Sequence, residues 1–97
     1  MSTEHYIPLN QLCTHYEVEM SFFTQLNEFG LIEITTVSET HSIHEDCITE
    51  VEKMIRLHRE LDLNMEGIDT VFNLLDRIKE LQKELNVTKN RLRLYEE

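Results

Sequence analysis

The chain has 97 residues, of which 19 are acidic and nine are lysine or arginine, and its formal net charge is −10. A chain of this length forms one small domain with room for an added helix, and a domain this small gains stability from self-association. All the excess negative charge lies in the first half, because residues 1–52 hold ten acidic side chains and no lysine or arginine. Such a field disfavours contact with nucleic-acid phosphates and anionic membrane surfaces, and it favours basic protein partners.

Targeting signals and a disulfide framework are not expected from the sequence. The two cysteines, Cys13 and Cys47, are fewer than a small secreted domain usually carries. No basic segment followed by an apolar one suggests a signal peptide, and no run of about 18 apolar residues suggests a membrane span. We therefore expect reduced thiols in a cytoplasmic protein, with a frayed terminus over residues 1–6. Two glycines and one proline favour a mostly helical chain with short connections.

Two short helices are predicted first. One begins at Pro8, whose missing amide hydrogen has no consequence at the first helical position, and it runs to about residue 16. The second covers residues 19–29, with apolar side chains at helical spacing and Gly30 as its left-handed terminator. Two helices of this length joined by a few residues are typical of a helix-turn-helix.

A β-hairpin is predicted next. Residues 31–37 are rich in β-branched side chains and form its first strand, Ser38 and Glu39 form the turn, and residues 40–43 form the return strand. A hairpin in this place is the wing of a winged helix.

Two longer helices complete the chain. Ser42 and Glu45 have the spacing of a capping box, which predicts that a third helix begins near them. Residues 62–64 interrupt its apolar stripe, and Asn64 can cap a fourth helix. We therefore predict a mostly α fold: a winged helix-turn-helix unit over residues 1–63, and a fourth helix over residues 64–97 that continues into a coiled coil.

The fourth helix carries a heptad pattern. Its seam residues, separated alternately by three and four positions, are Val71, Leu74, Ile78, Leu81, Leu85, Thr88, Leu92 and Tyr95. This spacing is typical of a coiled coil, although Thr88 is a polar fault. Beyond Leu81 the small domain cannot cover the stripe. We predict a homodimer through Leu74, Ile78, Leu81, Leu85 and Leu92, and both parallel and antiparallel pairing remain open.

DNA binding is disfavoured by the charges of the two elements that would make it. A recognition helix and wing need lysine or arginine for phosphate contacts. The second helix instead carries Glu19 and Glu28, and the hairpin carries Glu33 and Glu39. No nucleic-acid partner is expected.

A basic protein partner is the interpretation that the charges favour, with simple solvation of the acids as the alternative. The predicted contacts are Glu17, Glu19, Phe22, Glu28 and Glu33. Phe22 lies about 100° around the helix from the core-facing Phe23, so it is expected to be a partly exposed hot spot or to pack beneath the hairpin.

The sequence motifs give little support for metal binding or catalysis. His41, His44 and Cys47 are three residues apart and are zinc-type donors, but they cross a predicted strand-to-helix junction and lack a CxxC pair. The sequence holds no nucleophile elbow and no glycine-rich phosphate loop. We predict no metal, no cofactor, no catalytic residue and no enzyme activity.

The order of elements resembles the MerR-type winged-helix domain, and the closer resemblance is to the CbpM-like chaperone-modulator family. It spans about residues 9–92. Its strongest part is Ile55-Arg-Leu-His-Arg-Glu-Leu-Asp-Leu-Asn-Met-Glu-Gly-Ile68 with Leu74-Leu-Asp-Arg-Ile78, and Leu12-Cys13-Thr14-His15 and Gly30-Leu31-Ile32 are also similar. Glu17 departs from the family pattern, in which a glycine is commoner in the turn.

The resemblance implies a function in chaperone regulation. Members bind the J-domain of a DnaJ-type or CbpA-like co-chaperone and block its stimulation of Hsp70. The J-domain presents a basic helix to Hsp70, which agrees with the acidic first half of this chain. The alternatives are a MerR-type DNA-binding transcriptional regulator and a dimeric adaptor for another basic protein.

Overall fold

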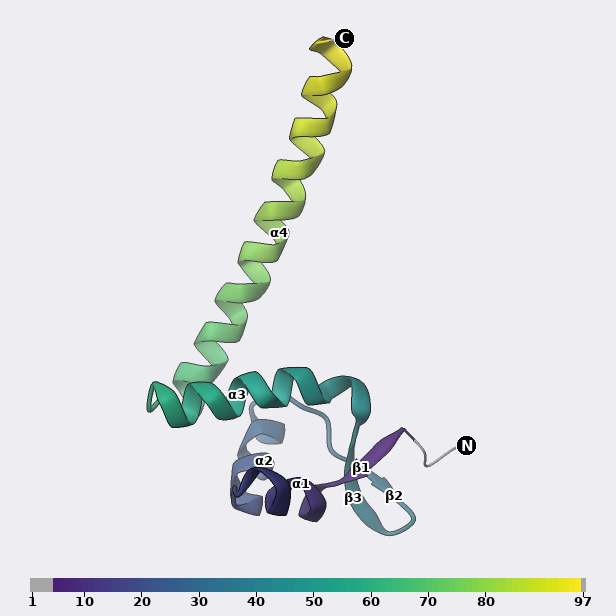
Figure 1. The fold of residues 1–97 in the computed structure, drawn as a ribbon, viewed down its shortest axis with the longest axis vertical. Coiled ribbons are helices and arrows are strands. Elements are labelled where there is room, and N and C mark those ends of the chain that lie inside the picture. Colours follow the sequence, from purple (N-terminus) through teal and green to yellow (C-terminus); the bar gives the residue numbers. More distant parts are fainter. Residues whose placement is uncertain (1–4, 97) are drawn as a thin grey trace.

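The computed structural model describes residues 5–96. They form a head of short helices and a small sheet, from which one long helix projects (Figure 1). The elements in chain order are β1 (Tyr6–Pro8), α1 (Leu9–Tyr16), α2 (Met20–Glu28), β2 (Thr35–Val37), β3 (Thr40–His44), a 3₁₀ turn η1 (Glu45–Cys47), α3 (Ile48–Glu60) and α4 (Met65–Glu96). The predicted fold class, a mostly α winged helix-turn-helix with a long C-terminal helix, is confirmed. Among the described helices, none has the length and apolarity needed to span a membrane.

The sheet contains a strand that we did not predict. Its order is β1-β3-β2, and β1 pairs antiparallel with β3, with Tyr6 opposite His44 and Ile7 opposite Ile43. The frayed terminus expected over residues 1–6 is therefore wrong at Tyr6, while residues 1–4 lie outside the described part of the chain. Because β1 is stabilised by a strand far along the sequence, its local pattern gave no sign of pairing.

The hairpin turn is confirmed, but the first hairpin strand is shorter than predicted. Ser38 and Glu39 have φ values of 49° and 65°, as expected for a two-residue turn between twisted strands. The strand β2 begins only at Thr35, because the preceding residues bind α2 and the core instead of the sheet. The amide of Ile34 donates to Oδ1 of Asn27 at 3.1 Å, and Ile32 is buried.

The predicted cap of the third helix is wrong, whereas the predicted cap of the fourth is confirmed. Ser42 belongs to the central strand β3 and is buried, so it caps no helix. Instead the Nδ1 of His44 accepts a hydrogen bond from the amide of Asp46 at 3.1 Å. At α4, Oδ1 of Asn64 accepts from the amide of Gly67 at 2.9 Å, as a helix cap should.

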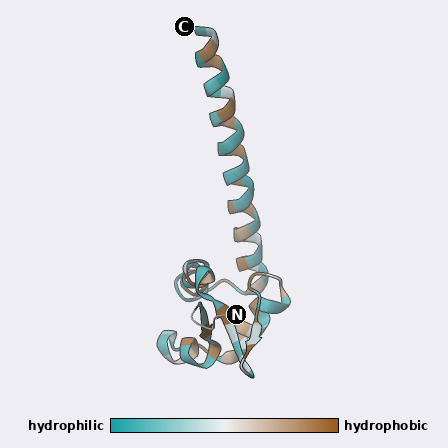
Figure 2. Cartoon of the chain, turned by 90° about the vertical axis from the view of Figure 1, so that its right-hand side faces the viewer, coloured by the Kyte–Doolittle hydropathy of each residue, from teal (hydrophilic) through white to brown (hydrophobic). Residues whose placement is uncertain are grey.

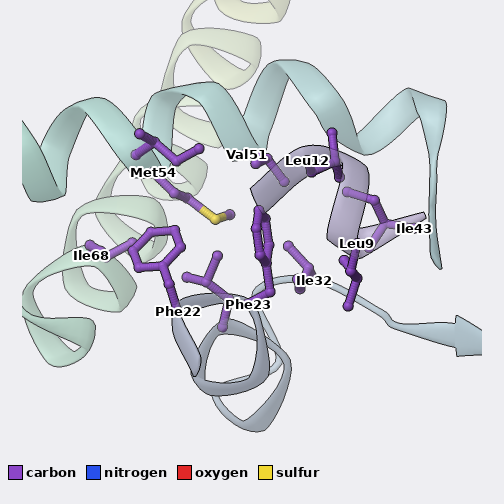
Figure 3. Close-up of a cluster of buried hydrophobic side chains, with 11 residues drawn as sticks. Leu9, Leu12, Phe22, Phe23, Ile32, Ile43, Val51, Met54 and Ile68 are labelled. Atoms are coloured by element: carbon purple, nitrogen blue, oxygen red, sulfur yellow. The ribbon is translucent and has the colours of Figure 1, made fainter. Parts of the chain in front are cut away.

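One core joins the described elements of the head (Figure 3). Its buried side chains are Leu9, Leu12, Phe22, Phe23, Leu26, Ile32, Ile43, Val51, Met54, Ile55 and Ile68. Ile68 comes from the first turns of α4, so the start of this helix is anchored in the head while the remainder projects away (Figure 1). The boundary after residue 63, between the winged helix-turn-helix unit and the fourth helix, stays a prediction.

Candidate functional site

Two of the predicted contact residues lie at the turn between α1 and α2. Glu17 follows α1 in the left-handed conformation, with φ 56° and ψ 47°, and Glu19 is the N-cap of α2. The amide of Val18 donates to the carbonyl of Cys13 at 3.1 Å and closes the turn. Both glutamate side chains are exposed, so a partner can reach the carboxylates.

Arg59 of α3 forms hydrogen bonds to this turn. This residue was not identified from the sequence. Its Nη2 donates to the carbonyl of Tyr16 and, at 2.8 Å, to the carbonyl of Glu17. Hydrogen bonds from a guanidinium are among the stronger ones in proteins, so α3 holds the helix-turn-helix in place. Arg59 also brings a cation next to the acidic turn, although no cation occurs within residues 1–52.

Phe22 is buried, which corrects both expectations for it. Only 7% of its surface is exposed, and its ring lies 5.8 Å from that of Phe23 and 5.3 Å from that of His58. It packs between α2 and α3 and not beneath the hairpin. Local spacing could not predict this, because the cover comes from α3.

Glu17, Glu19 and Phe22 nevertheless meet around one hollow. It encloses about 370 Å³ and is lined by Glu17, Val18, Glu19, Ser21, Phe22, Gln25, His58, Arg59 and Met65. Its lining combines two carboxylates and one guanidinium with the apolar side chains of Val18, Phe22 and Met65. Such a site suits a cationic side chain with an aliphatic stem.

Glu28 and Glu33 lie elsewhere on the head. Glu28 is the last residue of α2 and is exposed. Glu33 is also exposed, and its charge acts on Cys47, which lies about 16 Å along the α3 axis from His58. The five predicted contacts therefore do not form one cluster; Glu33 belongs to a separate acidic area.

The acidic area around Glu33 includes the thiol of Cys47, whose pKa is raised. Burial raises the pKa of Cys47 most, and the negative charges of Asp46, Glu33 and Glu50 raise it further. Burial also raises the pKa of Cys13. Both thiols are therefore less acidic than an ordinary cysteine and are poor nucleophiles at neutral pH. Within residues 5–96, no three histidine, cysteine or acidic side chains gather in a way that could hold a metal ion.

The predicted dimer seam is exposed along α4. The exposed fractions are 54% for Leu74, 48% for Ile78, 61% for Leu81, 53% for Leu85 and 56% for Leu92. Figure 2 shows apolar bands recurring along α4 toward the C-terminal end. Dimerisation stays a prediction, and these exposures mean that the single chain itself leaves the seam uncovered.

Similarity to known proteins extends over most of the chain. The family model described as "MerR HTH family regulatory protein" matches residues 7–90. The chaperone modulatory protein CbpM of Pseudomonas entomophila (strain L48) is 24% identical over 87 residues, which cover 89% of this chain and 86% of that protein. The protein of the same name from Pseudomonas putida (strain F1) is 28% identical with the same coverage.

A third relative comes from another genus. The chaperone modulatory protein CbpM of Escherichia coli O1:K1 / APEC is 26% identical over 85 residues, which cover 87% of this chain and 84% of that protein. No solved structure matches this chain.

Proposed function

We propose a chaperone-modulating role for this chain, which belongs to the MerR HTH family of regulatory proteins. The relatives that carry the name chaperone modulatory protein align with nearly the whole chain at 24–28% identity. The specific act that we propose is non-enzymatic: the protein binds the J-domain of a DnaJ-type co-chaperone and so prevents the J-domain from stimulating Hsp70.

The exposed acids of the head are the observation that carries this proposal. Glu17, Glu19, Glu28 and Glu33 are all exposed, and the first 52 residues offer no lysine or arginine. A DNA-binding surface requires the opposite sign of charge. An acidic face complements the basic helix that the family resemblance assigns to the J-domain, and such complementarity speeds encounter and selects the partner.

Glu28 supports a binding role because it does not serve folding. It lies in the last turn of α2, a helix with no basic residue in that turn. An acid at this end opposes the helix dipole and destabilises an exposed helix by about 0.3–1 kcal/mol. A carboxylate in this position is better explained by what it binds than by what it stabilises.

Occlusion is the mechanism that follows. The acidic face covers the basic helix of the J-domain, and Hsp70 then has no access to it. Phe22 has a structural role: its ring is buried between α2 and α3, where it supports the α1–α2 turn and the hollow. Glu17 and Glu19 hold the cationic side chains at the hollow, and Glu28 and Glu33 extend the field around the head.

A charge-reversal experiment tests the proposal. Glu19→Lys combined with Glu28→Lys should lower the potency of this protein, as an inhibitor of J-domain-stimulated Hsp70 ATPase activity, by about tenfold or more. The lysine at position 28 suits the dipole of α2, so the loss should not come from unfolding at that site, and a thermal melt checks the pair. Glu80→Lys, an exposed reversal on α4, is the matched control and should leave inhibition unchanged. Full inhibition by the double variant would refute this surface.

A further inference from the structure

We propose that a second hollow, between α2 and the β2–β3 hairpin, receives an apolar side chain of the bound partner. The partner segment that carries this side chain is a basic helix. This inference rests on the proposed J-domain binding, and it adds a specific anchoring contact to the electrostatic one. We call the site the α2–hairpin hollow.

Three parts of the head build the α2–hairpin hollow: the start of α1, one face of α2, and the hairpin with the residue that precedes it. The hollow encloses about 360 Å³ and is lined by Leu9, Met20, Thr24, Asn27, Ile34, Thr36 and His41. That volume is near the lower end of the range for small-ligand pockets, about 300–1,000 Å³. It leaves room for one large side chain of a partner.

The polar side chains of the lining already have partners inside the protein. Thr24 Oγ1 donates to the carbonyl one turn earlier in α2 at 3.2 Å, and Oδ1 of Asn27 accepts from the amide of Ile34 at 3.1 Å. The hydroxyl of Thr36 lies 3.4 Å from Nδ1 of His41. An apolar occupant therefore displaces water from the hollow without leaving these groups unpaired.

The apolar side chains of the lining are available to a partner. Met20 is 44% exposed in the described part of the chain, and it shares the lining with Leu9 and Ile34. A methionine adapts its shape to an incoming side chain, and the burial of apolar surface favours the contact. The hydrogen bond between Asn27 and Ile34 holds the hairpin segment against α2, so the hollow is formed before the partner arrives.

The charges around the hollow decide what kind of segment can carry this side chain. No lysine, arginine, aspartate or glutamate is among the lining residues. Glu19 precedes Met20, Glu28 follows Asn27 and Glu39 lies in the hairpin turn, and all three glutamates are exposed. Residues 1–52 hold no lysine or arginine to offset them. A segment with basic side chains beside its apolar one is therefore favoured, and an acidic segment is repelled.

The helix α2 separates this hollow from the one at the α1–α2 turn. At about 100° per residue, Met20, Thr24 and Asn27 lie within about 60° of one another around the helix axis. Gln25, which lines the other hollow, lies about 140° from Met20, and Glu28 falls between the two faces at about 80°. A basic helix that crosses α2 can therefore place an apolar side chain in one hollow and a cationic side chain in the other.

The position of the hollow raises DNA as the other partner, and its chemistry favours a protein. A helix-turn-helix regulator places its second helix in the major groove, so α2 and the hairpin are the elements that would meet a duplex. Such a contact needs cations for the phosphates. The hollow offers apolar side chains with carboxylates nearby instead, which suits the anchor residue of a protein helix.

Filling the hollow tests the proposal. Thr24→Phe places an aromatic ring on the face of α2 that lines the hollow, and threonine and phenylalanine have similar helix propensities. The affinity for an isolated J-domain, measured by calorimetry, should fall by about tenfold or more.

Thr14→Phe is the matched control. Thr14 is exposed on α1, and its hydroxyl donates to the carbonyl of Asn10 at 3.1 Å, the same bond to the preceding turn that Thr24 makes. It lines neither hollow, so this variant should change the affinity by less than about twofold. An equal loss in both variants would contradict a specific role for the α2–hairpin hollow.

Salt separates the apolar contact from the charged ones. The factor by which Thr24→Phe lowers the affinity should be the same at low and high salt, because an apolar contact is not screened. Glu28→Gln should lower the affinity at low salt and have little effect at high salt, since exposed charges are screened. A loss in Thr24→Phe that disappears at high salt would refute the apolar anchor.

Met20→Ala keeps the proposal testable if a thermal melt shows that Thr24→Phe perturbs the fold. Because Met20 is 44% exposed, its truncation should leave the melting temperature nearly unchanged. The affinity for the J-domain should fall by about fivefold, and an unchanged affinity would overturn the proposed contact.

The remaining outcomes distinguish this inference from the proposed function. Unchanged binding by a folded Thr24→Phe variant, alongside binding by the unaltered protein, would overturn the hollow and leave the proposed function intact. Absence of J-domain binding by the unaltered protein would overturn the proposed function and this occupant with it. Sedimentation of the same samples tests a second copy as the occupant: weakened self-association of Thr24→Phe with full J-domain affinity would refute our assignment.

Discussion

Individual residues show how the turn between α1 and α2 combines folding with charge. Glu17 holds a left-handed backbone conformation that is strained for any residue with a Cβ atom. Glycine, which has no Cβ atom, adopts this conformation without such strain. The left-handed geometry is kept in this chain despite the glutamate, and the carboxylate is added to the lining of the hollow.

We therefore predict that Glu17→Gly stabilises the fold and weakens binding. The free energy of unfolding should rise by about 1 kcal/mol, as measured by urea denaturation, while affinity for the J-domain falls because a carboxylate is lost. Glu39→Gly is the matched control, since Glu39 has a φ of 65° in the hairpin turn; it should stabilise similarly without changing affinity. A loss of stability in Glu17→Gly would contradict the account of the turn.

The role of a residue could be predicted where its contacts lie close by in the sequence. It could not be predicted where its contacts lie far away in the sequence. Gly30, with φ 74°, and Asn64 act within a few positions of themselves, so their roles as terminator and cap could be read from the chain. Arg59 binds a turn 42 residues earlier, and the cover over Phe22 comes from α3. No short-range pattern encodes such contacts.

Among the elements, predictability follows the length of the repeating pattern. The 32-residue helix α4 repeats its seam several times, and its helical character was evident. The three-residue strand β1 has too few positions for any period, and its pairing with β3 is a tertiary event. The hairpin lies between these cases, because its turn was predicted correctly and its first strand was predicted to begin too early.

The end of α4 supports a prediction about self-association. Tyr95→Ala should raise the dimer dissociation constant by about tenfold, because it removes the aromatic ring of the last residue of the predicted seam. Leu94→Ala is the control, because Leu94 is 77% exposed, adjoins Tyr95 and lies outside the seam; it should change the constant by less than about twofold. Sedimentation equilibrium measures both, and equal effects would exclude Tyr95 from the interface.

At the scale of the whole molecule, charge is separated along the long axis. The head is strongly acidic and the outer half of α4 is basic, and the longest dimension of the molecule is 59 Å. The acidic head is the end that we propose meets a basic partner. The net charge of each segment was visible in the sequence, but the distance between the segments required the structure.

The most direct test of the central claim is a calorimetric titration of this protein with an isolated J-domain from the same organism, at low and at high salt. The acidic-face account predicts saturable binding at low salt and a clear loss of affinity at high salt, because exposed charges are screened as the Debye length shortens. Absence of binding at low salt, or an affinity that salt leaves unchanged, would contradict it.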